Sequence, residues 1–283
     1  MLSYRHGFHA GNHADVLKHL TLSLLLQSLL KKEKPFFFMD THGGAGRYAL
    51  SAEWAIKNRE FESGIGRIWQ RSSLPKGLSP YLDAVRTTNP SSQLRWYPGS
   101  PRIARHFLRP QDRMVLAELH PKESLELARE FEGDRQVKVE ALDGYQSLKA
   151  HLPPKERRGL IHIDPAYEVK DERRRVLEAL LDATRRWPTG IFAVWYPIQD
   201  GATRDEFLKR VEKLKIPKTM VVELMVRPEE AFRLNGSGMI LINPPWQLDQ
   251  ELSLLLPFLS DLLGEGGQGS SQLQWLHGEL PAP

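Results

Sequence analysis

The residue types that can activate an adenine amino group occur together in one short string, Asp164-Pro165-Ala166-Tyr167. Such an amino group is a poor nucleophile, so a site must hold its hydrogens with acceptors and align its lone pair on the incoming carbon. The aspartate and the proline-fixed backbone carbonyl supply two acceptors, and the tyrosine supplies a face on which a flipped base stacks. The string predicts methylation of an adenine from S-adenosylmethionine, with Asp164, Pro165 and Tyr167 as catalytic residues.

A second string of this kind, Asn243-Pro244-Pro245-Trp246, matches the four-residue consensus for such sites more closely. It follows the last strand of a predicted hairpin. If that strand is antiparallel to the rest of the sheet, its end lies at the edge opposite the cofactor. We therefore predict a structural role for the second string and a catalytic role for the first.

Acidic residues follow three other predicted strands, which end at Asp40, Glu118 and Asp143-Gly144. Ligands of open α/β sheets bind at the carboxyl ends of the strands, so these side chains are expected to meet in one site. Glu118 is suited to accept both hydroxyl protons of a ribose, and Asp143 can hold an adenine amino group. The glycine-rich loop after Asp40 ends in Gly46-Arg47-Tyr48 and lacks the Lys and Ser/Thr of a phosphate-binding loop, which argues against a nucleoside triphosphate.

The N-terminal segment contains a dense cluster of polar and aromatic side chains: Tyr4, Arg5, His6, His9, His13, Asp15, Lys18 and His19. Histidines at this spacing can ligate a metal, but the chain has no cysteine and only one carboxylate is nearby. A segment that covers a nucleotide site is the better interpretation. Ser100 and Pro101 fit the N-cap and first position of a helix, whose free backbone amides would lie beside the site if the segment folds back onto it.

Alternating strands and helices predict an α/β fold with a doubly wound parallel sheet. Asn12 can cap a helix that extends from His13 to Lys34, where Pro35 ends it. Short apolar runs predict strands at 36–39, 114–119, 137–142, 159–163 and 191–195. Helical patterns separate the later runs at 121–131, 146–151 and 171–187.

Two further features indicate the Rossmann-like class I S-adenosylmethionine-dependent methyltransferase fold. The first two strands are separated by about seventy residues, too many for a crossover, which predicts a small helical insertion with helical stretches at 54–71 and 81–86. Runs at 219–226 and 238–242, joined by a polar segment, predict an antiparallel hairpin. The glycine-rich tail from Gly264 is expected to be flexible, up to a possible last strand at 272–277.

These patterns predict two parts in the chain. Residues 1–46 and 111–283 are expected to form the Rossmann-like methyltransferase domain, in which residues 1–34 cover the site. Residues 47–110 are expected to form an insertion subdomain.

The composition permits a large core and a polyanionic partner. Of the 283 residues 41% are hydrophobic, and 39 Lys and Arg against 35 Asp and Glu give a net charge of +4. Basic residues cluster at 102, 105 and 109, 155–158, 173–175 and 185–186, and a solvated surface is the simplest interpretation of each run. The absence of cysteine excludes disulfides, thiolate zinc sites and a cysteine nucleophile. The apolar stretch 20–30 is too short to span a membrane and the first residues lack a secretory signal, so we expect a cytoplasmic protein with no membrane partner.

Several segments together resemble the RlmJ family of ribosomal RNA adenine-N6 methyltransferases: YRHGFHAGNHADVLKH, DTHGGAGRY, YPGSPRIARHFLRPQD, ELHP, the Asp143-Gly144 pair and SGMILINPPW. The resemblance covers nearly the whole chain. It implies a monomeric enzyme that uses S-adenosylmethionine, releases S-adenosylhomocysteine and needs no metal. Its substrate would be one adenine of 23S ribosomal RNA, methylated before ribosome assembly is complete.

The same resemblance assigns roles to individual residues. The implied cofactor contacts are His19, His42, Ser100, Glu118, Asp143, Gly144 and Asp164, the last also as the catalytic acceptor. The implied substrate-binding positions are Tyr4, His6, Lys18 and Tyr167. This chain departs from the family pattern at Gly43, usually an alanine, and at Ala166, usually a second proline. The missing proline frees one φ angle, so we expect an active but slower enzyme.

Other functions are compatible with the same residues. The acceptor pair serves equally for DNA adenine or for a protein glutamine side chain. A non-catalytic RNA-binding assembly factor that retains the fold and works through its arginine-rich faces is the alternative from a different class.

Overall fold

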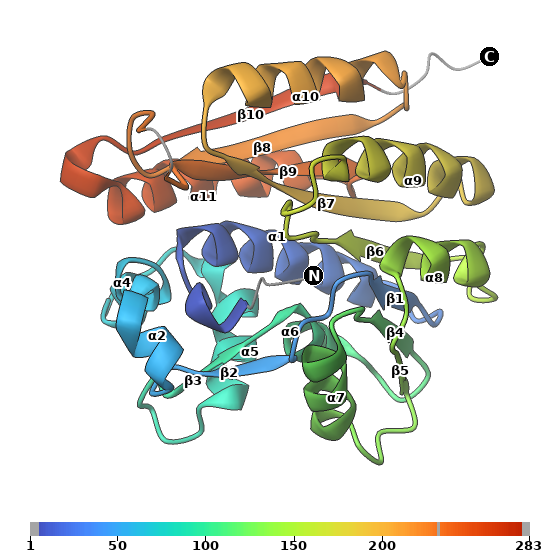
Figure 1. The fold of residues 1–283 in the computed structure, drawn as a ribbon, viewed down its shortest axis with the longest axis horizontal. Coiled ribbons are helices and arrows are strands. Elements are labelled where there is room, and N and C mark those ends of the chain that lie inside the picture. Colours follow the sequence, from blue (N-terminus) through green and yellow to red (C-terminus); the bar gives the residue numbers. More distant parts are fainter. Residues whose placement is uncertain (1–5, 231–232, 279–283) are drawn as a thin grey trace.

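The apolar run that follows Pro35 forms β1 (Phe37–Asp40), the middle one of five parallel strands in an eight-stranded sheet (Figure 1). The computed structural model describes residues 6–230 and 233–278. The strands, in order across the sheet, are β10 (Ser270–His277), β8 (Thr219–Met225), β9 (Gly236–Ile242), β7 (Ile191–Ile198), β6 (Gly159–Ile163), β1 (Phe37–Asp40), β4 (Arg113–Ala117) and β5 (Val137–Glu140). Every residue of β1 and β6 is buried, because helices cover both faces of the sheet there.

The strand directions confirm the predicted class I methyltransferase fold. Strands β5, β4, β1, β6 and β7 pair in parallel. Strand β9 is antiparallel to both β7 and β8, and β10 adds a further antiparallel edge strand. The five predicted parallel strands and the hairpin are therefore present. The chain leaves the parallel strands at one common edge, where the acidic residues were expected to meet.

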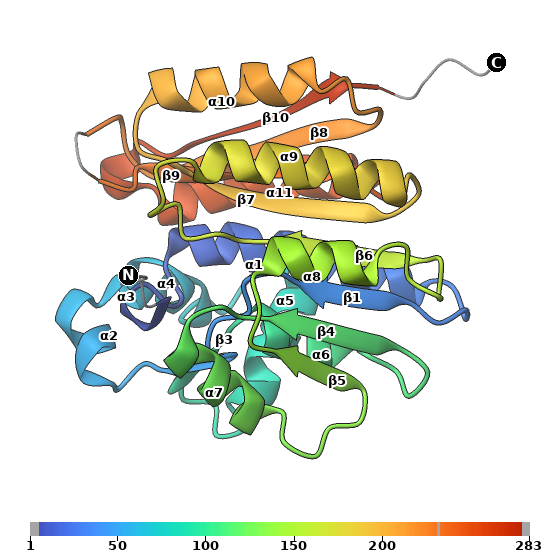
Figure 2. The same ribbon diagram turned by 45° about the vertical axis from the view of Figure 1, so that its right-hand side comes forward.

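Helices form a layer on each face of the sheet (Figure 2). One layer contains α8 (Gly144–His151), α9 (Glu172–Arg186) and α10 (Gly201–Lys213). The other layer contains α1 (His13–Leu30), α5 (Ser79–Thr88), α6 (Ser100–Phe107), α7 (Pro121–Glu130) and α11 (Leu248–Leu263). Within the described ranges, no helix is long and apolar enough to cross a membrane.

Helix α1 is a core helix. Its leucines are buried against the sheet and the neighbouring helices, so only its N-terminal turns can border a site. Asn12 caps it as predicted, because its Oδ1 accepts the backbone N–H of Asp15 at 3.0 Å. The helix ends at Leu30 instead of Lys34. The guanidinium groups of Arg109 and Arg158 bind the carbonyl oxygens of residues 29, 32 and 34, which lets the chain leave the helix early.

The segment between β1 and β4 contains more than helices. Two strands that the sequence did not predict, β2 (Arg47–Ala49) and β3 (Trp96–Pro98), pair antiparallel. They are joined through α2 (Glu53–Asn58), α3 (Glu60–Ser63), α4 (Ile65–Trp69), η2 (Lys76–Leu78) and α5. The ribbon forms because Tyr48 and Tyr97 are both buried, and the Tyr97 hydroxyl hydrogen-bonds with that of Tyr81 in the core. The assignment of residues 47–110 to a separate subdomain stays a prediction.

The glycine-rich tail is ordered, so the expectation of a flexible segment from Gly264 was wrong. Residues 265–267 form η3 (Glu265–Gly267), and the backbone N–H of Glu265 donates to Val226 O at 2.7 Å. A Cβ at Gly269 would lie 1.9 Å from Ser260 O. The glycine therefore serves close packing against α11, and β10 begins at Ser270.

The second motif, Asn243-Pro244-Pro245-Trp246, lies beyond the end of antiparallel β9, at the sheet edge where β7 begins. The Asn243 side chain donates to the carbonyl oxygens of Pro188 and Gly190, both at 2.8 Å. Asn243 has a φ of 53°, a left-handed conformation that asparagine tolerates. The predicted placement away from the catalytic edge is confirmed, and the asparagine anchors the turn before β7.

We expect Asn243→Ala to lower the free energy of unfolding by about 1–2 kcal/mol, because two hydrogen bonds are lost and alanine tolerates positive φ less well. Urea denaturation measures this loss. The affinity for S-adenosylhomocysteine should stay within twofold of the wild type. A variant with wild-type stability that no longer binds this compound would contradict the structural role.

Candidate active site

One cavity of about 600 Å³ collects the predicted site residues at the carboxyl ends of β1, β4, β5 and β6. Its wall includes most of the candidates that the structure describes: His6, Lys18, His19, His42, Ser100, Glu118, Asp143, Gly144, Asp164, Pro165 and Tyr167. Asp40 was expected to meet them, but it is fully buried and does not line the cavity. Tyr4 and Arg5 lie outside the described residues. Residues far apart in the chain thus converge, which is what the strand-end argument predicts.

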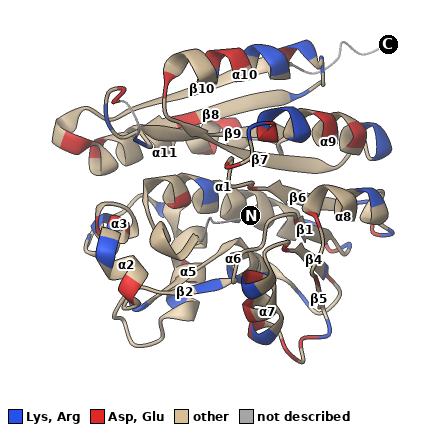
Figure 3. Cartoon of the chain, in the orientation of Figure 1, with Lys and Arg blue, Asp and Glu red and all other residues tan. Residues whose placement is uncertain are grey.

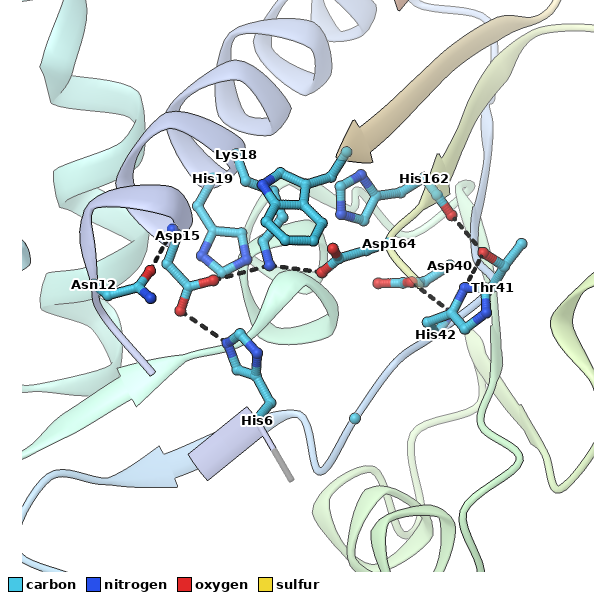
Figure 4. Close-up of polar contacts among 12 residues, drawn as sticks. His6, Asn12, Asp15, Lys18, His19, Asp40, Thr41, His42, His162 and Asp164 are labelled. Carbon is cyan, nitrogen blue, oxygen red and sulfur yellow. Dashed lines mark hydrogen bonds and ion pairs between the residues drawn. The ribbon is translucent and has the colours of Figure 1, made fainter. Parts of the chain in front are cut away.

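A chain of alternating charges ends on Asp164 (Figure 4). The Lys18 ammonium donates to Asp164 Oδ2 at 2.6 Å and lies 2.8 Å from Asp15 Oδ1. Asp15 Oδ2 accepts from His6 Nε2 and from the backbone N–H of Gly11, each at 2.8 Å. Helix α1 and the end of β6 are therefore joined through charged side chains inside the protein.

The charges decide which groups are ionised. Burial would raise the pKa of Asp164, but the charge and hydrogen bond of Lys18, together with the smaller effects of His162 and His6, outweigh it and the pKa is lowered. Burial would lower the pKa of Lys18, but Asp15 and Asp164 outweigh it and that pKa is raised. Asp164 is therefore a carboxylate at neutral pH, able to accept hydrogen bonds and unable to donate them.

Tyr167 is held in a strained and well-defined position. Its φ is 54°, unusual for an aromatic residue, and its hydroxyl donates to Trp195 O at 2.8 Å. Its ring meets the Trp195 ring edge-on with centroids 5.9 Å apart. Burial raises the pKa of the phenol, so the hydroxyl remains a donor and fixes the ring in the cavity wall.

The acidic residues of β4 and β5 line the other end of the cavity. The Glu118 carboxylate accepts the backbone N–H groups of Gly44 at 2.8 Å and His120 at 2.7 Å. Burial raises the pKa of Glu118. The backbone N–H of Leu119 also acts on this carboxylate. Because the two oxygens together offer about four acceptor positions, acceptor capacity remains for a hydroxyl group.

Asp143 has a structural role in addition to its place in the cavity. Its Oδ1 caps α8 by accepting the backbone N–H groups of Tyr145 and Gln146, and its Oδ2 accepts from Arg175 at 2.6 Å. A Cβ at the adjacent Gly144 would lie 2.1 Å from Thr41 O. The turn after β5 therefore requires glycine to pack against the turn after β1.

Ser100 is the first residue of α6 and not its N-cap, which is Gly99. The prediction was wrong by one residue, and no side chain caps this helix. Ser100 instead acts on the carboxylate of Asp40, whose pKa it lowers. Asp40 is fully buried, and its Oδ2 has no hydrogen-bond partner among the described residues. Burial raises the pKa of Asp40 to about 7. Hydrogen bonds from Ser100 and from the backbone N–H of His42 lower this pKa, but their effect is smaller.

The histidines around the cavity are mostly neutral. Burial lowers the pKa of His13, His42 and His162 to about 4, and it lowers that of His19 as well. His6 and His9 instead contact the carboxylates of Asp15 and Glu60. Within residues 6–230 and 233–278, no group of three or more His, Asp or Glu residues is placed to hold a metal ion.

Trp195 and Arg175 are among the site residues that were not assigned a role from the sequence. Trp195 lines the cavity, provides the carbonyl that fixes Tyr167 and lies over the Lys18 ammonium, whose Nζ is 5.5 Å from its ring centroid. Arg175 holds Asp143 and lies over the ring of Tyr145. Their positions in the sequence could have identified both residues. Trp195 is an aromatic residue in a predicted parallel strand, and Arg175 belongs to a run of arginines at the start of a predicted helix.

We expect the ionisation of Asp40 to make the folded state less stable as pH rises. Its folded pKa of about 7 lies above the ordinary value of 3.8, so between these pH values the folded state binds more protons than the unfolded state. Asp40→Asn removes this effect. The free energy of unfolding of the variant, relative to wild type, should increase by about 1–4 kcal/mol from pH 4 to pH 8.

Urea denaturation across this pH range measures the difference. Asp134→Asn is the control, because the pKa of Asp134 is lowered and its contribution does not decline as pH rises. A difference between Asp40→Asn and wild type that stays constant or falls with pH would contradict the prediction.

Comparison with known proteins agrees with this geometry. The family model described as "Ribosomal RNA large subunit methyltransferase D, RlmJ" matches residues 33–277. The chain is 48% identical over 277 residues to Ribosomal RNA large subunit methyltransferase J of Escherichia coli (strain K12), covering 98% of this chain and 99% of the relative. It is 45% identical over 278 residues to the protein of the same name from Haemophilus influenzae, covering 98% and 99%.

A solved structure has the same fold over nearly the whole length. The crystal structure of a protein from Legionella pneumophila str. Philadelphia 1 superposes with a TM-score of 0.88 at 38% identity, covering 94% of this chain and 98% of that chain. The resemblance noted in the sequence is confirmed. The chain belongs to the family described as ribosomal RNA large subunit methyltransferase D, RlmJ.

Proposed function

We propose that the chain transfers the methyl group of S-adenosylmethionine to N6 of an adenine in 23S ribosomal RNA. The observation that carries the proposal is the buried Asp164 carboxylate, kept ionised by Lys18 in the same cavity as Glu118, Asp143 and Tyr167. Family membership supports the reaction class and the ribosomal RNA substrate.

The residues of the cavity suit the cofactor. Glu118 retains acceptor capacity for the ribose hydroxyl groups, and Asp143 can accept from the adenine amino group. Leu119 lines the same end and is 49% exposed, so it offers an apolar surface to the adenine ring. His42, Ser100 and His19 are the remaining proposed contacts. Bound S-adenosylmethionine would supply a methyl group on a sulfonium centre, an electrophile that needs no metal activation.

The protein groups then position the acceptor nitrogen. Lys18 occupies Asp164 Oδ2, and no described residue donates to Oδ1, which is left to accept one hydrogen of the adenine amino group. We assign the second hydrogen to Pro165 O and the stacking of the base to Tyr167. His6 and Tyr4 complete the proposed substrate side. The proton released after transfer is strongly acidic, and water accepts it without a dedicated base.

The finer parts of the proposal concern the setting of the reaction. We infer a monomeric cytoplasmic enzyme, without a metal, that acts on free ribosomal RNA before ribosome assembly is complete. We also assign residues 1–46 and 111–283 to the methyltransferase domain and 47–110 to the insertion. Helix α1 belongs to the core, so the covering role proposed for residues 1–34 is limited to the residues before α1 and its first two turns.

We expect Asp164→Ala to lower the rate of methyl transfer about 10²–10³-fold, because an acceptor of the amino hydrogens is lost. Transfer of a labelled methyl group to protein-free 23S ribosomal RNA measures the rate, with duplex DNA and unfolded protein as alternative substrates. Asn243→Ala is the matched control, because it changes the acceptor residue of the other four-residue string, and it should keep wild-type activity.

Two outcomes would contradict the proposal. If calorimetry detects no binding of S-adenosylmethionine or S-adenosylhomocysteine, the methyltransferase assignment fails. If the protein binds the cofactor but methylates only DNA or glutamine, the RNA assignment fails.

We expect Ala166→Pro to increase turnover and to raise the free energy of unfolding by about 0.4–1 kcal/mol, because proline restricts the unfolded chain and the catalytic loop. Ala166 is exposed, so water reaches its backbone N–H and proline would remove no protein hydrogen bond. Steady-state rates and urea denaturation test both effects. Unchanged turnover together with unchanged stability would show that the second proline is dispensable here.

A further inference from the structure

In the described part of the chain the cavity wall contains four arginines, Arg173, Arg175, Arg227 and Arg233. Arg175 pairs with Asp143 at 2.6 Å, Arg233 pairs with Glu230 at 2.9 Å, and Arg227 pairs with Glu265. Arg173 has no carboxylate oxygen within 4.0 Å in the described part of the chain. Among these four arginines, Arg173 is therefore the one that forms no ion pair with a described residue.

The position of Arg173 is defined by a ring instead of an acid. Its guanidinium carbon lies 5.5 Å from the centroid of the Tyr167 ring. Its charge also reaches Asp200, whose pKa is lowered mainly by hydrogen bonds from Thr203 and in smaller part by Arg173. Asp200 Oδ1 accepts the backbone N–H of Thr203 at 2.7 Å, which makes it the cap of α10.

Three consecutive arginines form a basic stretch near the start of α9 (Figure 3). Their surroundings differ, although their sequence suggested one solvated run. Arg174 is 53% exposed and pairs with Asp171 and Glu178 on its own helix. Arg175 binds Asp143. Arg173 is half-buried, lines the cavity and lies over Tyr167. The solvated-face interpretation therefore fits Arg174 only.

The location of Arg173 suits a phosphodiester. Arg173 interacts with Asp200 only at a distance and forms no ion pair among the described residues, and a half-buried cation in this state is costly unless a ligand supplies a close negative charge. A guanidinium matches the geometry of a phosphate and can bind it through two parallel hydrogen bonds. A base that leaves its helix to stack on Tyr167 brings its own backbone phosphates to the mouth of the cavity, within reach of the side chain that covers this ring.

We propose that Arg173 forms a phosphate subsite, in which its guanidinium binds the phosphodiester next to the flipped adenosine while it lies over Tyr167. This inference rests on the proposed RNA substrate. Arg173 is then a positioning residue that contributes affinity independent of base sequence. It touches neither the cofactor end of the cavity nor the Asp15–Lys18–Asp164 charges.

Arg173→Gln and Arg174→Gln test the subsite as a matched pair, because each removes one positive charge from adjacent positions of the same helix. The affinity for a ribosomal RNA fragment is measured by fluorescence anisotropy from 50 to 300 mM salt, about the range in which phosphate contacts lose strength. We expect Arg173→Gln to weaken binding three- to tenfold and to reduce the salt slope by about 1. Arg174→Gln should change neither by more than twofold.

Two further measurements separate this role from a structural one. Calorimetry of S-adenosylhomocysteine binding should give the same Kd for wild type and both variants. Arg173→Lys keeps the charge without the planar fork, so it should recover the salt slope and restore the KM for RNA only in part.

The outcomes are distinct. Equal RNA affinity and salt slope in Arg173→Gln and Arg174→Gln would overturn the subsite while leaving the proposed function intact, provided that the wild type methylates RNA. Loss of S-adenosylhomocysteine binding in Arg173→Gln would overturn it by assigning the arginine to the cofactor. A wild-type protein that neither binds nor methylates RNA would overturn both the subsite and the proposed function.

Discussion

The buried ammonium of Lys18 is the interaction on which the rest of the site depends. Its side chain is 4% exposed, and those of its partners Asp15 and Asp164 are 1% and 13% exposed. Moving such charges out of water costs several kcal/mol each, and only close pairing offsets the cost. If either carboxylate were missing, a charge would remain buried without compensation. The three side chains therefore hold one another in place, and the ionised state of Asp164 is a consequence of the fold around Lys18.

This constraint explains why α1 has to be a core helix. Asp15 and Lys18 reach Asp164 only if the helix lies against the sheet close to the end of β6, and its buried leucines fix that placement. The neighbouring histidines support the same arrangement. Burial lowers the pKa of His19 and His162, so neither imidazole adds a positive charge that would repel Lys18 at neutral pH.

Much of the fold could be predicted because strand and helix periodicity is a local property. The apolar runs at 114–119 and 159–163 marked β4 and β6, and the acidic residues at their ends, Glu118 and Asp164, marked the edge where the cavity lies. Pairing over long separations could not be read in the same way. Lys18 and Asp164 are 146 positions apart, and nothing in their local sequence identifies them as partners. The β2–β3 pair was not predicted for a related reason. Each strand has three residues, which is too short to show the alternation of polar and apolar residues that marks a strand.

Strand direction is the property that separates the two four-residue strings. Asp164 and Asn243 both follow a buried strand, both precede a proline, and both strings end in an aromatic residue. Only β6 runs in the direction that brings its carboxyl end to the cavity, whereas antiparallel β9 delivers Asn243 to the turn before β7. The asparagine string is closer to the consensus, yet both N–H donors of the Asn243 side chain bind backbone carbonyl oxygens. The aspartate string departs at Ala166, yet it meets an ammonium that keeps its acceptor charged. A motif of this kind therefore acquires its chemistry from the element that carries it and from the charge placed opposite. In the proposed function, the departure at Ala166 then bears on how firmly the loop is held and not on which residue accepts.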